Sequence, residues 1–194
     1  MAQGRGLAIL SGLLHGLGAV GAVDSTRRQN MKREHLQRDG YLVVPGVVPM
    51  DLCNQVIQDI KHHVLGDEND PCIAPDSYGW IEMYHYSSMW NVRQHPAVHA
   101  EFAELFGTEK LWVSIDRVNC KEPLDEHAEG HSFLHWDICI NQRPRPFEVQ
   151  GVVALTDTDE TMGGFRCLPG LYRNLDVWLV SQPCSKAQSP FLKP

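Results

Sequence analysis

The sequence is short of basic residues. Its 194 residues include 17 Lys and Arg against 24 Asp and Glu, so the formal net charge is -7 at pH 7. Proteins that bind nucleic acids need a surplus of cationic side chains for phosphate contact, and this composition therefore argues against a nucleic-acid partner. A local basic cluster at residues 27–38 is typical of a solvated helix face or a linker.

Closely spaced cysteine pairs are also absent. The sequence has six cysteines and no Cys-x-x-Cys pair; they stand at positions 53, 72, 120, 139, 167 and 184. This spacing fits neither a zinc-finger framework nor the dense pattern of a small disulfide-linked domain. We therefore expect reduced thiols and a cytoplasmic location.

The amino-terminal segment is apolar and carries no charge between residues 7 and 23. It is short for a membrane span and is interrupted by His15 and several glycines, so we expect no membrane association. It also resembles the apolar region of a secretion signal or an organelle presequence, which are the alternatives to a cytoplasmic location. We expect an extension or targeting segment at 1–30, a folded domain at 31–183 and a polar tail at 184–194.

Helical patterns come first along the chain and strand patterns follow them. The apolar spacing and the Pro and Gly positions predict helices at 31–39, 50–64 and 96–107, with a strand at 41–48 between the first two. Short β-like runs separated by turn residues follow at 111–121, 132–140, 149–157 and 164–170. This order favours an α+β, mainly β domain with a largely antiparallel sheet, sandwich or barrel in its second half.

A histidine and a carboxylate stand two residues apart within one of these apolar runs. Residues i and i+2 of a strand lie on the same face, so His135 and Asp137 would reach a common point. Imidazole and carboxylate are two of the three ligands that bind non-haem Fe(II) on one face. A surface strand with alternating polar residues would have the same pattern.

Several motifs together resemble the phytanoyl-CoA dioxygenase family. The resemblance covers about residues 33–183 and is carried by DGYLVVPGVV, the helix QHPAVHAEFAELFG, LWVSIDRVNCKEP, LHWD and LTDTDETMGGFRCLPG. It implies a double-stranded β-helix (jelly-roll, cupin-like) with N-terminal helices. It also implies an Fe(II) cofactor, 2-oxoglutarate as co-substrate and the oxidation of a small organic substrate.

The same resemblance assigns roles to individual residues. His135 and Asp137 match the family's first two iron ligands, while Asn119, Lys121 and Gln150 match positions near the co-substrate. For Lys121 and Gln150, a loop charge and a hydrogen-bonded polar group of the barrel are the alternatives. We expect Asp157, Gly163 and Gly164 to shape a turn.

The sequence departs from the family after Asp137. The family's third ligand is a later histidine, followed by an Arg or Lys that binds 2-oxoglutarate, but His135 is the last of the ten histidines here. We therefore expect an incomplete domain that lacks the last strands, and an inactive, truncated form of such an enzyme is one alternative. The upstream residues His85, His127 and His131 are weak candidates for the third ligand. The alternative is a non-catalytic β-helix domain that binds a small molecule or a protein partner.

Overall fold

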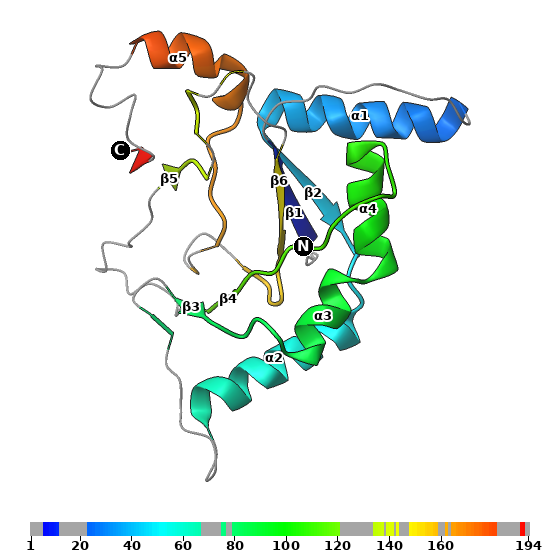
Figure 1. Ribbon diagram of the computed structural model, residues 1–194, viewed down its shortest axis with the longest axis vertical. Helices are drawn as coiled ribbons and strands as arrows, with labels where there is room; N and C mark the ends of the chain where they lie inside the picture. Colours follow the sequence, from blue (N-terminus) through cyan, green and yellow to red (C-terminus); the bar gives the residue numbers. More distant parts are fainter. Residues whose placement is uncertain are drawn as a thin grey trace. The chain divides into compact units, whose positions relative to one another are not determined.

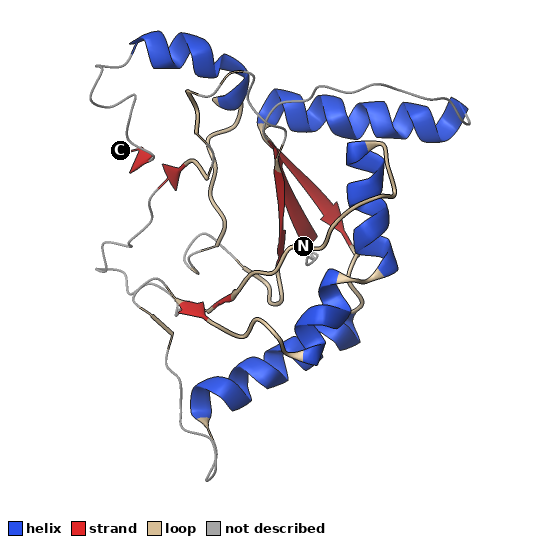
Figure 2. Cartoon of the chain, viewed as in Figure 1, coloured by secondary structure: helices blue, strands red, loops and turns tan. Residues whose placement is uncertain are grey.

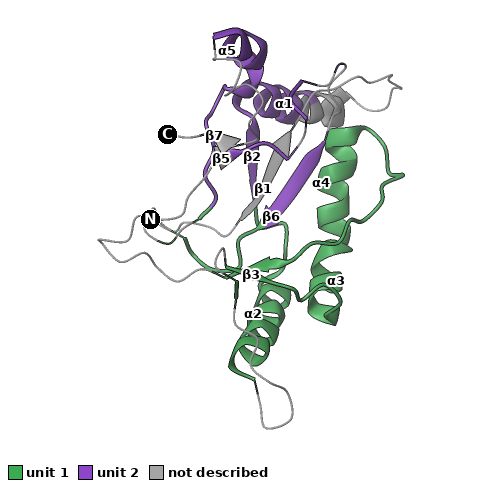
Figure 3. Cartoon of the chain, turned by 60° about the vertical axis from the view of Figure 1, so that its left-hand side comes forward, with its two compact units in different colours: residues 1–7, 45–130, 153–164 green, residues 8–44, 131–152, 165–194 purple. Residues whose placement is uncertain are grey.

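The described part of the chain mixes helices and strands (Figure 1; Figure 2). The chain divides into two compact units (Figure 3), made of residues 1–7, 45–130 and 153–164 and of residues 8–44, 131–152 and 165–194. The computed structural model describes residues 6–11, 23–66, 75–76, 79–120, 134–137, 139–141, 143, 148–158, 162, 164–181 and 191–192.

The first unit contains three helices in sequence. They are α2 (Met50–Leu65), α3 (Ser87–Arg93) and α4 (Pro96–Phe106); α2 packs against α3, and α3 against α4. In α2, apolar residues recur every three or four positions, and the helix buries Cys53 and Val56. The helix predicted at 50–64 is confirmed, and α3 is a helix that the sequence did not predict.

The ends of α4 follow from residue types at its two boundaries. His95 precedes the helix, and its Nδ1 accepts a hydrogen bond from the amide of Ala97 at 3.3 Å. Pro96 suits the first helical position because it has no amide hydrogen to leave unpaired. At the other end Gly107 adopts φ +70°, and its amide donates to the Ala103 carbonyl at 2.8 Å. These boundaries confirm the helix predicted at 96–107.

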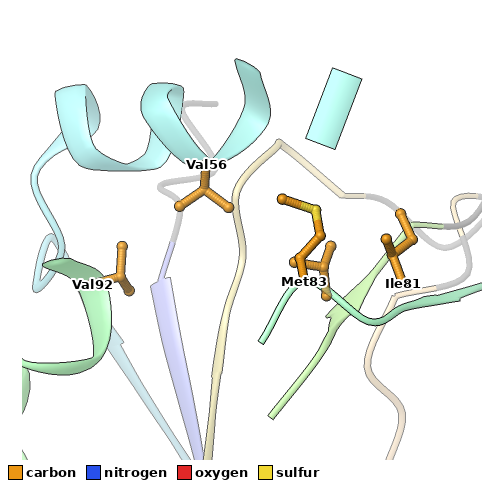
Figure 4. Close-up of a cluster of buried hydrophobic side chains, with 5 residues drawn as sticks. Val56, Ile81, Met83 and Val92 are labelled. Atoms are coloured by element: carbon orange, nitrogen blue, oxygen red, sulfur yellow. The ribbon is translucent and has the colours of Figure 1, made fainter. Parts of the chain in front are cut away.

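The core of the first unit joins α2 and α3 to a two-stranded antiparallel sheet. Strand β3 (Trp80–Ile81) pairs with β4 (Val118–Asn119), so that Trp80 stands opposite Asn119. Figure 4 shows the buried side chains that fill the space between these elements. They are Val56, Ile81, Met83, Val92 and Val118.

The first helix of the second unit is α1 (Val23–Asp39), which is longer than the helix predicted at 31–39. It ends at Gly40, whose φ of +84° is strained for residues with a Cβ, and the Gly40 amide donates to the Leu36 carbonyl at 2.8 Å. The helix packs against a 3₁₀ turn, η1 (Tyr172–Asn174), that leads into α5 (Leu175–Ser181). The Gly170 amide, which donates to the Asp39 carbonyl at 3.1 Å, fixes this contact.

Two small sheets complete the described strands. Strand β1 (Gly6–Ser11) lies between β2 (Tyr41–Pro45) and β6 (Val149–Val153) in a three-stranded sheet. Strand β5 (Leu134–His135) pairs antiparallel with β7 (Phe191–Leu192). Both β1 and β7 come from segments for which the sequence predicts an extension and a tail.

Several predicted strands are shorter in the structure. Within the described part of the run at 111–121, which ends at residue 120, only residues 118–119 are in a strand, and Trp112 is fully exposed. Residues 164–170 form no strand, so that prediction is wrong. A β-like sequence becomes a strand only where a neighbouring backbone pairs with it, and a single sequence does not reveal the neighbour.

No helix among the described residues is long and apolar enough to cross a membrane.

Candidate functional site

The two predicted iron ligands approach each other in the second unit. His135 ends strand β5, and the chain bends at Asp137 two residues later. The imidazole Nε2 of His135 lies 3.1 Å from the Asp137 carboxylate Oδ1. Their side chains are 41% and 53% exposed, so both are open to solvent. The imidazole and the carboxylate thus meet although only His135 lies in a strand and the chain bends at Asp137.

Gln150 joins this pair from strand β6. Its side-chain nitrogen Nε2 donates a hydrogen bond to Oδ2 of Asp137 at 2.8 Å. The two oxygens of one carboxylate thus have different neighbours, since Oδ1 faces His135 and Oδ2 accepts from Gln150. Two residues that the sequence singled out, His135 at the end of β5 and Gln150 on β6, thus meet at the Asp137 carboxylate.

The other two predicted residues have different outcomes. Asn119 lies on β4 in the first unit, where it stands opposite Trp80 and is exposed. Lys121 lies outside the described residues. The structure therefore leaves the co-substrate role of both residues as a prediction.

The donor atoms of His135 and Asp137 fit two positions of a divalent metal site. Imidazole nitrogen and carboxylate oxygen bind such ions at about 2.1 Å, so two ligands at right angles lie about 3 Å apart. The observed separation of 3.1 Å matches this spacing. The same separation also suits an ion pair with a protonated imidazole.

Among the described residues, no group of three or more His, Cys, Asp or Glu side chains could hold a metal ion. Of the upstream histidines considered as substitutes, His85 is exposed and belongs to the first unit. His127 and His131 lie outside the described residues. The described part of the chain thus provides a two-ligand arrangement.

Trp136, between the two candidate ligands, faces a different environment. Its ring centroid lies 6.4 Å from that of Tyr172, with the planes tilted by 49°. Its Nε1 is buried and has no hydrogen-bond partner in the part of the chain that the structure describes. This aromatic contact involves a residue that takes no part in the polar contact between His135 and Asp137.

Arg143 connects the segment after the site to α5. Its Nη1 donates to the Ile140 carbonyl at 2.8 Å, and its Nη2 pairs with the Asp176 carboxylate. Neither this ion pair nor the contact between Trp136 and Tyr172 is predicted by the sequence. Each joins residues more than thirty positions apart, a distance over which neither periodicity nor local motifs carry a signal.

Thiols near the site differ in their surroundings. Cys139, two residues after Asp137, is exposed, while Cys167 is partly covered, and burial raises the pKa of its thiol. The four described cysteines carry free thiols; they are Cys53, Cys120, Cys139 and Cys167. A raised pKa means that less of the Cys167 thiol is in the reactive thiolate form at neutral pH.

Comparison of the chain with protein-family models, with curated proteins and with solved structures finds no match.

Proposed function

We propose that this chain is an Fe(II)/2-oxoglutarate-dependent dioxygenase of phytanoyl-CoA dioxygenase type that oxidises a small organic substrate. The observation that carries the proposal is the 3.1 Å approach of His135 Nε2 to Asp137 Oδ1. The motifs around this pair support it, because they extend the resemblance over most of residues 33–183. The proposed fold is the double-stranded β-helix of that family.

Each site residue has a defined task in this proposal. His135 and Asp137 would hold the iron by a nitrogen and an oxygen atom. With 2-oxoglutarate and dioxygen, bound iron supplies the oxidising power that breaks a substrate C–H bond. The exposure of both side chains leaves this face of the site open to small molecules.

Four free thiols among the described cysteines support a cytoplasmic location.

Conversion of 2-oxoglutarate to succinate tests the proposal. The full chain is supplied with Fe(II), ascorbate and 2-oxoglutarate, and succinate is measured with and without iron. Because the described residues offer two ligands, we expect slow, substrate-independent turnover that His135→Ala and Asp137→Ala abolish. His62→Ala, which removes an exposed imidazole from α2, should leave turnover unchanged. Iron-dependent succinate formation that survives in His135→Ala would contradict the assignment.

The second candidate is a β-helix domain that binds a small molecule or a protein partner without redox chemistry. It is favoured by one specific observation, which is that the described residues hold no group of three or more His, Cys, Asp or Glu side chains that could bind a metal ion. Titration with Fe(II) separates the two functions. Wild-type protein that binds iron measurably, with loss of binding in His135→Ala, supports the oxygenase. Negligible and equal affinity in both proteins supports the binding domain.

A further inference from the structure

The Asp137 carboxylate is held at its two oxygens by residues from different parts of the chain. Oδ1 lies 3.1 Å from His135 Nε2, and Oδ2 accepts the hydrogen bond from Gln150 Nε2 at 2.8 Å. Gln150 comes from β6, thirteen residues later in the sequence. The contact is therefore a tertiary one and does not arise from local chain geometry.

A carboxylate that makes no other contact binds a cation through one oxygen or both and rotates freely before it binds. An amide that donates to one oxygen removes that freedom and leaves the other oxygen as the free ligand. In this site the amide occupies Oδ2, so the atom beside the imidazole is Oδ1. The arrangement thus favours coordination by a single oxygen of Asp137, with less loss of side-chain entropy on binding.

We propose that Gln150 is a positioning residue that holds Oδ2 of Asp137 so that Oδ1 and His135 Nε2 together bind a divalent cation. The inference rests on the proposed function, and it gives Gln150 a different role from the co-substrate contact expected from the sequence. Gln150 acts through the carboxylate and does not touch the reacting atoms.

The exposure of both side chains indicates that the hydrogen bond from Gln150 orients the Asp137 carboxylate and contributes little to folding stability. Gln150 is exposed, and so is Asp137. A hydrogen bond between exposed side chains competes with water at both ends and contributes little to stability. Loss of the amide should therefore leave the protein folded and alter chiefly what the carboxylate does.

The test is Co(II) binding by the full chain, because Co(II) substitutes for Fe(II) and its visible spectrum reports ligand number and geometry. The variants are Gln150→Met, which keeps side-chain length but has no donor, and Gln55→Met, which changes an exposed glutamine of α2 in the same way. We expect Gln150→Met to weaken Co(II) binding by up to about 10-fold, the lower end of the effect of losing such a partner because this hydrogen bond is exposed, and to change the spectrum. Gln55→Met should bind as the wild type does, and neither variant should shift the urea midpoint appreciably.

A double-mutant cycle separates positioning from a general effect. In an Asp137→Asn background, Gln150→Met should produce no further loss of affinity, because the carboxylate that Gln150 orients is already gone. Both proteins are also compared without metal. The side-chain NH₂ resonances of Gln150 should have different chemical shifts in the wild type and in Asp137→Asn. This measurement does not depend on metal binding or on folding of the Gln150 variants.

The outcomes distinguish this inference from the proposed function. Wild-type binding that His135→Ala abolishes and Gln150→Met leaves unchanged overturns the positioning role and keeps the metal site. Absence of Co(II) binding in the wild type overturns both. NH₂ resonances of Gln150 that do not respond to Asp137→Asn also overturn the positioning role.

Discussion

His63 Nδ1 and the hydroxyl oxygen of Tyr86 lie 2.9 Å apart, and their hydrogen bond joins α2 to the residue that precedes α3. The two rings meet edge to face, with centroids 5.6 Å apart and planes at 85°. The other ring nitrogen of His63, Nε2, is buried and has no partner in the described part of the chain. The tyrosine hydroxyl is therefore the partner that the structure gives this half-buried imidazole.

Removal of that hydroxyl should destabilise the first unit. Tyr86→Phe keeps the ring contact but leaves Nδ1 of His63 without its hydrogen bond, which should cost about 1 kcal/mol of unfolding free energy. Urea unfolding measures the change. Tyr84→Phe is the matched control, because Tyr84 accepts a hydrogen bond from Arg93 through its backbone carbonyl, which the substitution keeps. Equal losses in both variants would contradict the role of the hydrogen bond.

The core cluster of the first unit gives a larger expected effect. Met83 is completely buried beside Val56 and Ile81 (Figure 4). Met83→Ala should lower the unfolding free energy by about 2–5 kcal/mol, since it removes buried apolar surface and leaves a cavity. Met31→Ala, at a residue that is 63% exposed on α1, should change it by less than about 0.5 kcal/mol. Urea midpoints of the two variants, compared with the wild type, measure the difference.

The carboxyl end of α1 should respond to pH. The Arg38 guanidinium donates to both oxygens of Asp39, at 2.9 and 2.6 Å, and this hydrogen bonding lowers the pKa of the Asp39 carboxyl. A lowered folded-state pKa contributes stability above the unfolded value of about 3.9, and that stability is lost as pH falls through the folded pKa. The contribution is small because both groups are solvated.

Arg38→Gln should therefore raise the pKa of Asp39 and reduce stability slightly at about pH 6. The difference from the wild type should shrink at about pH 3, where the carboxyl is increasingly protonated in both proteins. Carbon NMR of the Asp39 carboxyl and urea midpoints at the two pH values measure these effects. Arg173→Gln, which removes an exposed cation from η1, controls for the change in net charge. A pKa of Asp39 that is the same in wild type and Arg38→Gln would contradict the interpretation.

The elements that the sequence predicted correctly are those whose signals lie in residues close together in the sequence. Helix α4 was predictable because Pro96 and Gly107 mark its ends, and α2 because apolar residues recur at helical spacing. His135 and Asp137 are also close in the sequence, but they meet where the chain bends at Asp137, and not through strand alternation. None of these required knowledge of a distant neighbour.

The missed features depend on distant contacts. Strand β7 pairs with β5 across more than fifty residues, and Gln150 reaches Asp137 from a different strand. Helix α5 contains β-branched valines at 177 and 180, which favour strands in isolation, so its sequence did not indicate a helix. Tertiary packing overrides such local preferences, and the contacts that cause this cannot be recognised in a single sequence.

Two thiols of the second unit should react at different rates. Cys139 is exposed, whereas burial raises the pKa of the Cys167 thiol. Because the thiolate is the nucleophile, Cys167 should be alkylated more slowly than Cys139 at neutral pH. Native protein treated with iodoacetamide at about pH 7.5, digested and analysed by mass spectrometry, gives the two rates separately.

The pH dependence of alkylation distinguishes a raised pKa from restricted access. An ordinary exposed thiol, with a pKa of about 8.5, approaches its maximum rate as pH rises past that value. For Cys167 the rate should continue to increase at higher pH, since more base is needed to form its thiolate. Restricted access alone would lower its rate at every pH and leave the midpoint unchanged. In urea the two cysteines should react alike, because unfolding removes the burial that separates them.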